Sequence, residues 1–168
     1  MKTQLMINGK LEDVEIENGN ITILGQEQKK NGWERVAPND EYATVSVTNV
    51  CTCSEDNDEY DDENYLVANY FCSYDLATDI LRAQDIWRRI LRFQAEEDNY
   101  VNHNIRGASK YYIYYNIDEN DIDVDVSYDN IVPFIPYFST EDKAERCIDL
   151  FRRDLIWLFT GFKSRTDR

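Results

Sequence analysis

Apolar and polar positions along the chain alternate with two different periods, and these periods predict the elements of the fold. Apolar residues on either side of Asn8-Gly9 and Asn18-Gly19 predict a three-stranded β meander over residues 4–24. The reason is that Asn-Gly supplies the positive φ angles of a type I′ turn. A polar loop follows, and then a short strand is expected at residues 33–36, with a turn at residues 38–40.

Two similar runs of elements follow the meander. In the first run, a Val- and Thr-rich stretch over residues 42–53 predicts β structure, and an apolar segment over residues 65–71 predicts a strand. Between them lies the segment 55–63, which has seven acidic residues and no basic one. Ser73 then predicts the cap of a helix that extends to about Asp98, because apolar residues recur there at helical spacing.

The second run has the same order of elements. Segments 111–117 and 122–128 are predicted to pair as a hairpin around an acidic turn, and an apolar segment at 131–138 predicts a third strand. A last helix is predicted to begin after Ser139 or Thr140 and to end at a glycine.

The two runs also match in sequence, at a constant offset of 67 residues. Tyr70-Phe71 aligns with Tyr137-Phe138, and an aspartate and an alanine recur at the same positions of the following helix start. We therefore predict an α+β fold with antiparallel sheets and two helices, built from a duplicated strand-strand-strand-helix unit plus an N-terminal β meander. The expected division is a meander at 1–40 and a duplicated unit at 41–168, with repeats at about 42–98 and 111–162, in one compact domain.

Four short motifs give the chain a resemblance to small uncharacterised proteins of bacteriophages and mobile elements. They are Gly32-Trp33-Glu34-Arg35-Val36, Tyr70 to Ala77, Lys110-Tyr111-Tyr112-Ile113, and Tyr137 to Ala144. The resemblance spans about residues 32–160. It implies a phage-type origin and no particular chemistry.

Composition limits the classes of function. The 168 residues are 42% hydrophobic and 13% aromatic, so a core is available despite a net charge of −15. The first residues lack the apolar core of a signal peptide, and no apolar run has the length of a membrane span. We therefore expect a cytoplasmic protein, in the cytosol of the host cell. The negative charge argues against direct binding to nucleic acid or to an anionic membrane.

Candidate catalytic and metal-binding residues are few. Cys51, Cys53, Cys72 and Cys147 are expected to be free thiols that serve as small core residues, since CxxC spacing is absent and a zinc site would depend on the fold. His103 is the only histidine, and it lies in a polar segment between the two runs. The glycines are dispersed, so no phosphate-binding loop and no cofactor are expected. The sequence predicts no enzyme and no metal site.

The negative charge is concentrated in two base-free segments. Residues 36–81 contain eleven acidic residues, and residues 111–142 contain eight; neither segment has a Lys or Arg. Much of the positive charge lies in the two predicted helices. In the second segment, Asp121, Asp123 and Asp125 alternate with apolar residues, so their carboxylates share one strand face about 6.6–7 Å apart. This spacing is comparable with that of phosphates along a nucleic-acid strand, and a soluble fold has no evident need for such a row.

These observations favour a phage-type inhibitor that covers the basic nucleic-acid-binding surface of a host protein. The host protein would be a defence or DNA- or RNA-handling protein, and a CRISPR effector is one such partner, which would make the chain an anti-CRISPR acting by nucleic-acid mimicry. The predicted partner-binding residues are acidic and come from both segments: Asp56, Asp58, Glu59, Asp61, Asp62, Asp118, Glu119, Asp121, Asp123 and Asp125.

Other interpretations remain open at this point. The charge can serve solubility alone. The chain can instead be a structural or assembly module, or a homodimer, that binds a protein through Tyr111, Tyr112, Tyr114 and Tyr115. A calcium loop starting at Asp121 lacks the required glycine and final glutamate. A further alternative is an enzyme built around the one histidine, His103.

Overall fold

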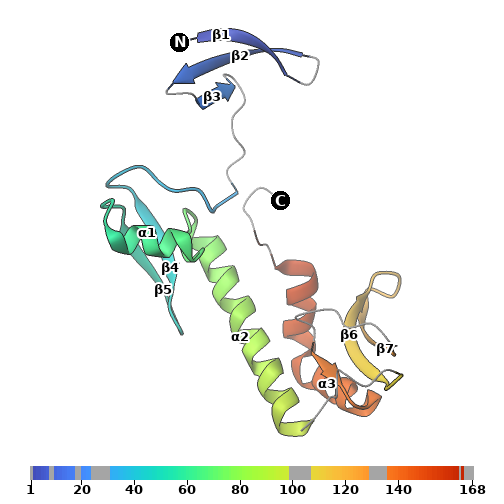
Figure 1. The fold of residues 1–168 in the computed structure, drawn as a ribbon. Helices are drawn as coiled ribbons and strands as arrows, with labels where there is room; N and C mark the ends of the chain where they lie inside the picture. Colours follow the sequence, from blue (N-terminus) through green and yellow to red (C-terminus); the bar gives the residue numbers. More distant parts are fainter. Residues whose placement is uncertain are drawn as a thin grey trace.

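A computed structural model describes most of the chain. The described residues are 2–7, 10–17, 20–23, 31–98, 107–128, 136–162 and 164, and every structural statement below concerns these residues. The fold class is α+β, as predicted, with helices and small antiparallel sheets (Figure 1).

The N-terminal residues form the predicted three-stranded antiparallel meander. Its strands are β1 (Lys2–Ile7), β2 (Lys10–Glu17) and β3 (Asn20–Ile23), in the order β1-β2-β3. The two Asn-Gly turns lie outside the described residues.

The next sheet is smaller than the sequence predicted. β4 (Glu41–Val45) and β5 (Val50–Ser54) form an antiparallel hairpin, because residues 46–49 turn the chain inside the predicted β stretch. The short strand expected at 33–36 is absent from the described residues. Instead, Trp33 packs its ring on Phe71 with 4.8 Å between centroids.

A helix takes the place of the acidic connection. α1 (Glu59–Leu66) begins at Asp58, whose side chain accepts the N–H of Asp61, while the Asp61 carboxylate accepts the N–H of Asp58. This reciprocal capping satisfies two amides of the first turn. The strand predicted at 65–71 is therefore wrong: its first residues end α1, and only Phe71 forms an isolated bridge, to Ala43.

One long helix connects two hydrophobic cores. α2 (Tyr74–Glu97) begins at the predicted Ser73 cap, which accepts the N–H of Leu76. Near its start, Leu76 and Ala77 pack with Ala43 and Phe71. Further along, other apolar residues of α2 enter the second and larger core, so that α2 supports both halves of the molecule (Figure 1).

The second half contains a three-stranded sheet covered by a helix. β6 (Lys110–Asn116) and β7 (Asp121–Ser127) form the predicted hairpin, and β8 (Tyr137–Phe138) pairs with β6, which gives the order β7-β6-β8. α3 (Glu141–Ile156) packs on this sheet and continues into a π-helical turn, η1 (Trp157–Gly161).

A buried carboxylate joins the two long helices. Asp98, which caps the end of α2, accepts hydrogen bonds from the N–H and hydroxyl of Ser139 and from the Lys143 ammonium at the start of α3. Burial alone would raise the pKa of Asp98, but these donors outweigh it and lower the pKa. The two helices are therefore held antiparallel by a charged contact as well as by their core.

The two halves share a pairing pattern. Phe71 pairs with β4 and Phe138 pairs with β6, in each case antiparallel to the first strand of a hairpin and just before a helix. The Ser73 side chain caps α2, whereas the predicted cap of α3 is wrong in its contact, because the Thr140 side chain makes no capping hydrogen bond. α1 has no counterpart among the residues of the second half that the structure describes. The apolar strand predicted from residue 131 is described only at its end, β8, and the duplication of the unit remains a prediction.

Candidate interaction surface

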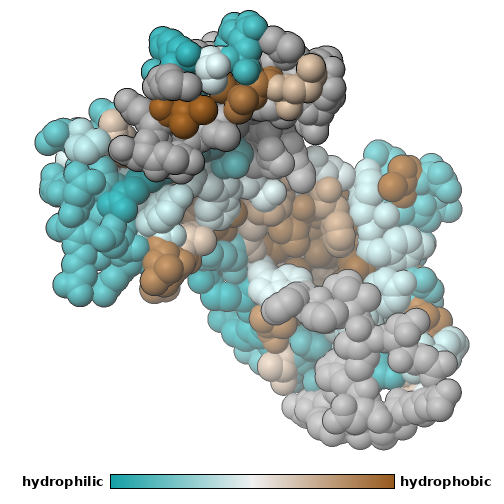
Figure 2. Space-filling view, turned by 45° about the horizontal axis from the view of Figure 1, so that its top comes forward, coloured by the Kyte–Doolittle hydropathy of each residue, from teal (hydrophilic) through white to brown (hydrophobic). Residues whose placement is uncertain are grey.

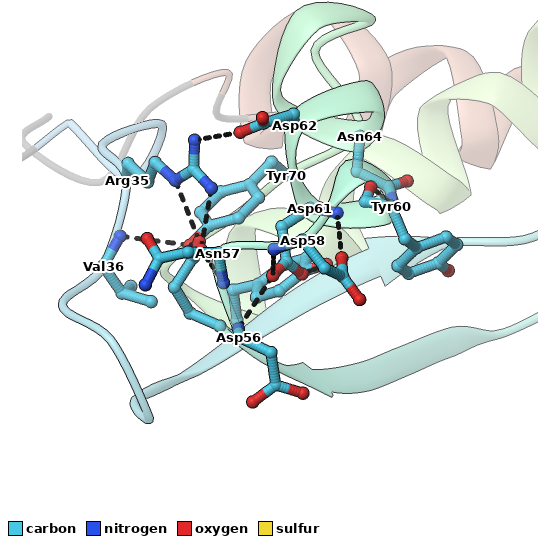
Figure 3. Close-up of polar contacts among 12 residues, drawn as sticks. Arg35, Val36, Asp56, Asn57, Asp58, Tyr60, Asp61, Asp62, Asn64 and Tyr70 are labelled. Carbon is cyan, nitrogen blue, oxygen red and sulfur yellow. Dashed lines mark hydrogen bonds and ion pairs between the residues drawn. The ribbon is translucent and has the colours of Figure 1, made fainter.

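Two of the acidic residues near α1 are buried. The Glu55 side chain is 1% exposed and accepts two hydrogen bonds from the Arg35 guanidinium, at 3.0 and 2.7 Å (Figure 3). It also accepts the Tyr70 hydroxyl at 2.6 Å and the N–H of Asn57 at 3.1 Å. The Arg35 hydrogen bonds lower the pKa of Glu55 against the opposing effect of burial. Glu55 is therefore a paired, ionised group of the interior.

Asp61 is the second buried carboxylate. It is 2% exposed and accepts the Tyr42 hydroxyl at 2.6 Å and the N–H of Asp56 at 2.8 Å. The hydrogen bond from Tyr42 is the main reason why the pKa of Asp61 is lowered. The expectation that Asp61 contacts a partner is wrong, because the fold turns this side chain inward to satisfy its own backbone and Tyr42.

The two phenol rings stack under α1. The centroids of Tyr42 and Tyr70 are 3.9 Å apart, with the rings nearly parallel. Burial raises the pKa of both phenols, and the adjacent carboxylates Asp61 and Glu55 raise it further. Together these contacts hold α1 against Tyr42 of β4 and the adjacent Tyr70 ring.

The remaining acidic residues of this region point outward. Asp56, Asp58, Glu59 and Asp62 are exposed, as predicted for a binding surface, and so is Glu63. Asp58 caps α1, and Asp62 forms an ion pair with Arg35 at 2.5 Å. Figure 2 shows the α1 side of the molecule, at the left, as mostly hydrophilic surface. We call Asp56, Asp58, Glu59, Asp62 and Glu63 the α1 acidic face.

The three aspartates of β7 have a structural role that the sequence analysis missed. Among the strands that the structure describes, β7 pairs with β6 alone, so alternate N–H groups on its other side have no strand partner there. Asp121, Asp123 and Asp125 each accept the N–H of the residue that follows, at 2.7–2.8 Å. The row of carboxylates therefore accepts the N–H groups at this edge of the sheet and gives the edge a negative charge. This structural role explains the alternate spacing of the aspartates without a binding partner.

These aspartates also have other contacts. Arg152 donates to Asp121 at 2.6 Å, and this contact and the N–H of Ile122 lower the pKa of Asp121. The hydroxyls of Tyr114 and Tyr112 donate to Asp123 and Asp125.

The predicted acidic residues form two separate groups. Asp118 and Glu119 are exposed in the turn between β6 and β7. Figure 1 places the β6–β7 hairpin and α1 on opposite sides of α2. The ten residues predicted to bind a partner therefore do not form one continuous surface.

The positive charge of the helices is largely neutralised within the helices. Arg89 and Arg82 pair with Asp154, and the guanidinium of Arg82 also lies 4.0 Å from the ring centre of Trp157. Arg146 pairs with Glu97 at 3.0 Å. The α1 acidic face, by contrast, has Arg35 as its one basic neighbour in the ion pairs of the described residues.

The four tyrosines proposed as an alternative surface divide between two faces of β6. Tyr111 and Tyr115 pack against the larger core, whereas Tyr112 and Tyr114 lie on the other face with the aspartates. All four are half-buried. Only two of them are therefore placed to meet a partner.

The cysteines are free, but only Cys147 is a core residue as expected. Its burial raises the pKa of the thiol to about 12. Cys51 is exposed, while Cys53 and Cys72 are half-buried. Within the described ranges, no three His, Cys, Asp or Glu side chains form a group that would hold a metal ion. His103 lies outside those ranges.

Sequence reasoning missed two features beside the α1 acidic face. The buried tyrosines Tyr42 and Tyr70 and the partly exposed Arg35 form its polar support. The only sequence signal was that Arg35 is the last base before the long base-free segment. Leu66 and Val67 are exposed, although their apolar segment predicted a strand.

Comparisons with known proteins identify no relative. No family model matches the chain, and no curated sequence and no solved structure matches it. In the part of the chain that the structure describes, no helix combines the length and the apolar character that crossing a membrane requires.

Proposed function

We propose that this chain is a non-enzymatic, phage-type inhibitor that binds a host protein on its basic nucleic-acid-binding surface. The host protein is a defence protein, such as a CRISPR effector, or another DNA- or RNA-handling protein. The supporting observation is the α1 acidic face, where carboxylates project from a helix whose buried side is fixed by the hydrogen bond between Asp61 and Tyr42. A fixed array of charge loses less conformational entropy on binding than a flexible acidic loop.

The charge of this region selects the kind of partner. Eleven acidic residues and no basic one lie between Val36 and Leu81, and the exposed ones repel phosphates. Carboxylates form charge-assisted hydrogen bonds with Arg and Lys, which line nucleic-acid-binding grooves. The partner is accordingly a basic protein, and the interaction weakens as salt is added.

The β6–β7 group is a poorer candidate for this role. Its three strand aspartates already bind backbone N–H groups, Tyr112, Tyr114 and Arg152. Glu59 and Glu63 have no ion pair among the described residues, so their charge is available to a partner.

A comparison of two variants with equal loss of charge tests the proposal. The α1 variant carries Glu59→Gln and Glu63→Gln, and the control carries Asp118→Asn and Glu119→Gln. Each protein is immobilised and exposed to a bacterial lysate with and without added DNA. We expect the wild type and the control to retain a nucleic-acid-binding protein that DNA and salt release, and the α1 variant to retain several-fold less. Equal retention by the α1 variant, or partners without any nucleic-acid function, would refute the proposal.

A second candidate function is supported by Tyr112 and Tyr114. In the described contacts α3 covers one face of the β7-β6-β8 sheet, and these rings lie on the other face. A structural or assembly module would use them to bind a protein or a second copy of the chain. Light scattering during a salt titration separates the two functions, because association through tyrosines persists at high salt.

A further inference from the structure

α1 has an inverted distribution of side chains. Its buried residues are Asp61 and Asn64, which are polar, and they are held by hydrogen bonds. Its apolar residues face solvent: Leu66 is 85% exposed, and Val67, just after the helix, is 69% exposed. Buried polar residues are an informative departure from the usual distribution, and exposed apolar residues become informative where they are adjacent, as Leu66 and Val67 are here.

The exposed apolar residues continue the acidic face. Residues three, four and seven positions apart lie on the same side of a helix, so Glu59, Asp62, Glu63 and Leu66 form one stripe. The stripe runs about 10 Å, or two turns, and ends at Leu66 and Val67. Tyr60, 55% exposed, adds an aromatic ring to the same helix. Carboxylates and apolar side chains are thus presented together on one outward-facing element.

Packing within the fold does not account for the apolar side chains at the exposed positions 66 and 67. α1 is anchored through Asp61, Asn64 and the stacked phenols, and neither Leu66 nor Val67 belongs to a hydrophobic core. Exposed aliphatic side chains rimmed by charge are typical of protein-binding sites, in which apolar anchors supply the binding energy and charges supply orientation.

We infer that α1 docks as a helix into a groove that has an apolar pocket for Leu66 and Val67 and a rim of Lys or Arg facing Glu59, Asp62 and Glu63. This inference rests on the proposed function and specifies its partner: the basic surface includes an apolar pocket about one helical turn from the cations that face Asp62 and Glu63 and about two turns from the cation that faces Glu59. The charge complementarity of the stripe selects a cationic protein as the occupant. Part of the affinity therefore resists salt.

The test uses four immobilised proteins in the same bacterial lysate at low and high salt. They are the wild type, the Leu66→Ser/Val67→Ser variant, the Glu59→Gln/Glu63→Gln variant, and a control with Ile117→Ser. Ile117 is 83% exposed in the turn after β6, so the control removes an equally exposed aliphatic residue from another place. Circular dichroism checks that each variant is folded.

We expect the Leu66→Ser/Val67→Ser variant to retain about tenfold less of the nucleic-acid-binding partner at both salt concentrations. The Ile117→Ser control should retain as much as the wild type. Equal retention by the Leu66→Ser/Val67→Ser variant would overturn the inference and leave the proposed function intact, provided that the Glu59→Gln/Glu63→Gln variant loses the partner. If the charge variant keeps the partner, the proposed function fails, and the inference fails with it.

Discussion

Replacing Glu55 by alanine tests whether the buried polar network holds the α1 half of the molecule together. The change removes the acceptor for the Tyr70 hydroxyl and for the N–H of Asn57, and it leaves Arg35 with Asp62 alone. A buried hydrogen bond to a charged acceptor contributes about 1.5–3 kcal/mol, and an orphaned buried donor costs a similar amount. The Tyr70 hydroxyl is fully shielded from water, whereas Arg35 is partly exposed and can be solvated.

We therefore expect Glu55→Ala to lower the free energy of unfolding by about 3 kcal/mol. For a chain of this length, that corresponds to a fall in Tm of about 6–12 °C. Urea unfolding followed by tryptophan fluorescence measures the change, because Trp33 packs on Phe71 beside the network. The control is Glu63→Ala, an exposed position on the neighbouring helix α1, which should change stability by no more than about 0.5 kcal/mol. Equal stability of the two variants would refute the structural role of Glu55.

The same network predicts a pH dependence with a defined sign. Hydrogen bonds from Arg35 lower the folded-state pKa of Glu55 below its ordinary value of 4.5. A lowered pKa contributes stability that is present above the ordinary value and is lost as the pH falls through the folded-state value. The stability difference between the wild type and Glu55→Gln should therefore be constant near neutral pH and should shrink below pH 4.5. A difference that persists unchanged into acid would contradict this assignment.

Three further predictions concern other parts of the molecule. Replacing Asp123 and Asp125 by Thr frees N–H groups on the edge of β7 and removes two charges, so aggregation measured by light scattering should become several-fold faster at neutral pH; an unchanged rate would argue against the edge role. Asp98→Ala leaves the donors at the start of α3 without an acceptor, and it should lower the free energy of unfolding by about 2–4 kcal/mol in a urea titration. A loss below about 0.5 kcal/mol would contradict the role of Asp98 in joining α2 and α3. In the folded protein, Cys51 should react with a thiol reagent well before Cys147, whose burial raises its pKa to about 12; equal rates would contradict the burial of Cys147.

The elements that the sequence predicted well are those specified by local signals. The cap at Ser73 and the helical spacing that follows it define α2, because a capping hydroxyl and an apolar stripe act within a few turns. The β6–β7 hairpin followed in the same way from strand alternation around an acidic turn. In the candidate site, local reasoning found the outward acids Asp56, Glu59 and Asp62.

The errors occurred where short segments admitted two structures. The apolar residues after the acidic run fit a strand as well as the end of a helix, because a run of this length has no distinctive period. The reciprocal hydrogen bonds between Asp58 and Asp61 stabilise the start of α1 and so favour the helix over the strand. Once α1 forms, Leu66 and Val67 face solvent instead of a core.

The sequence by itself determined the α+β class, the long capped helix, the hairpins and the segregation of charge, because each depends on residues that are near one another in the chain. Only the tertiary structure decided which carboxylates are exposed and available to bind a partner. Glu55 and Asp61 became interior groups because Arg35 and Tyr42, some twenty residues away, supply donors that replace water. The β7 aspartates serve the backbone because their strand lies at a sheet edge. Identical side chains thus have different roles, since the energy of a buried charge is set by the partners that the fold brings to it.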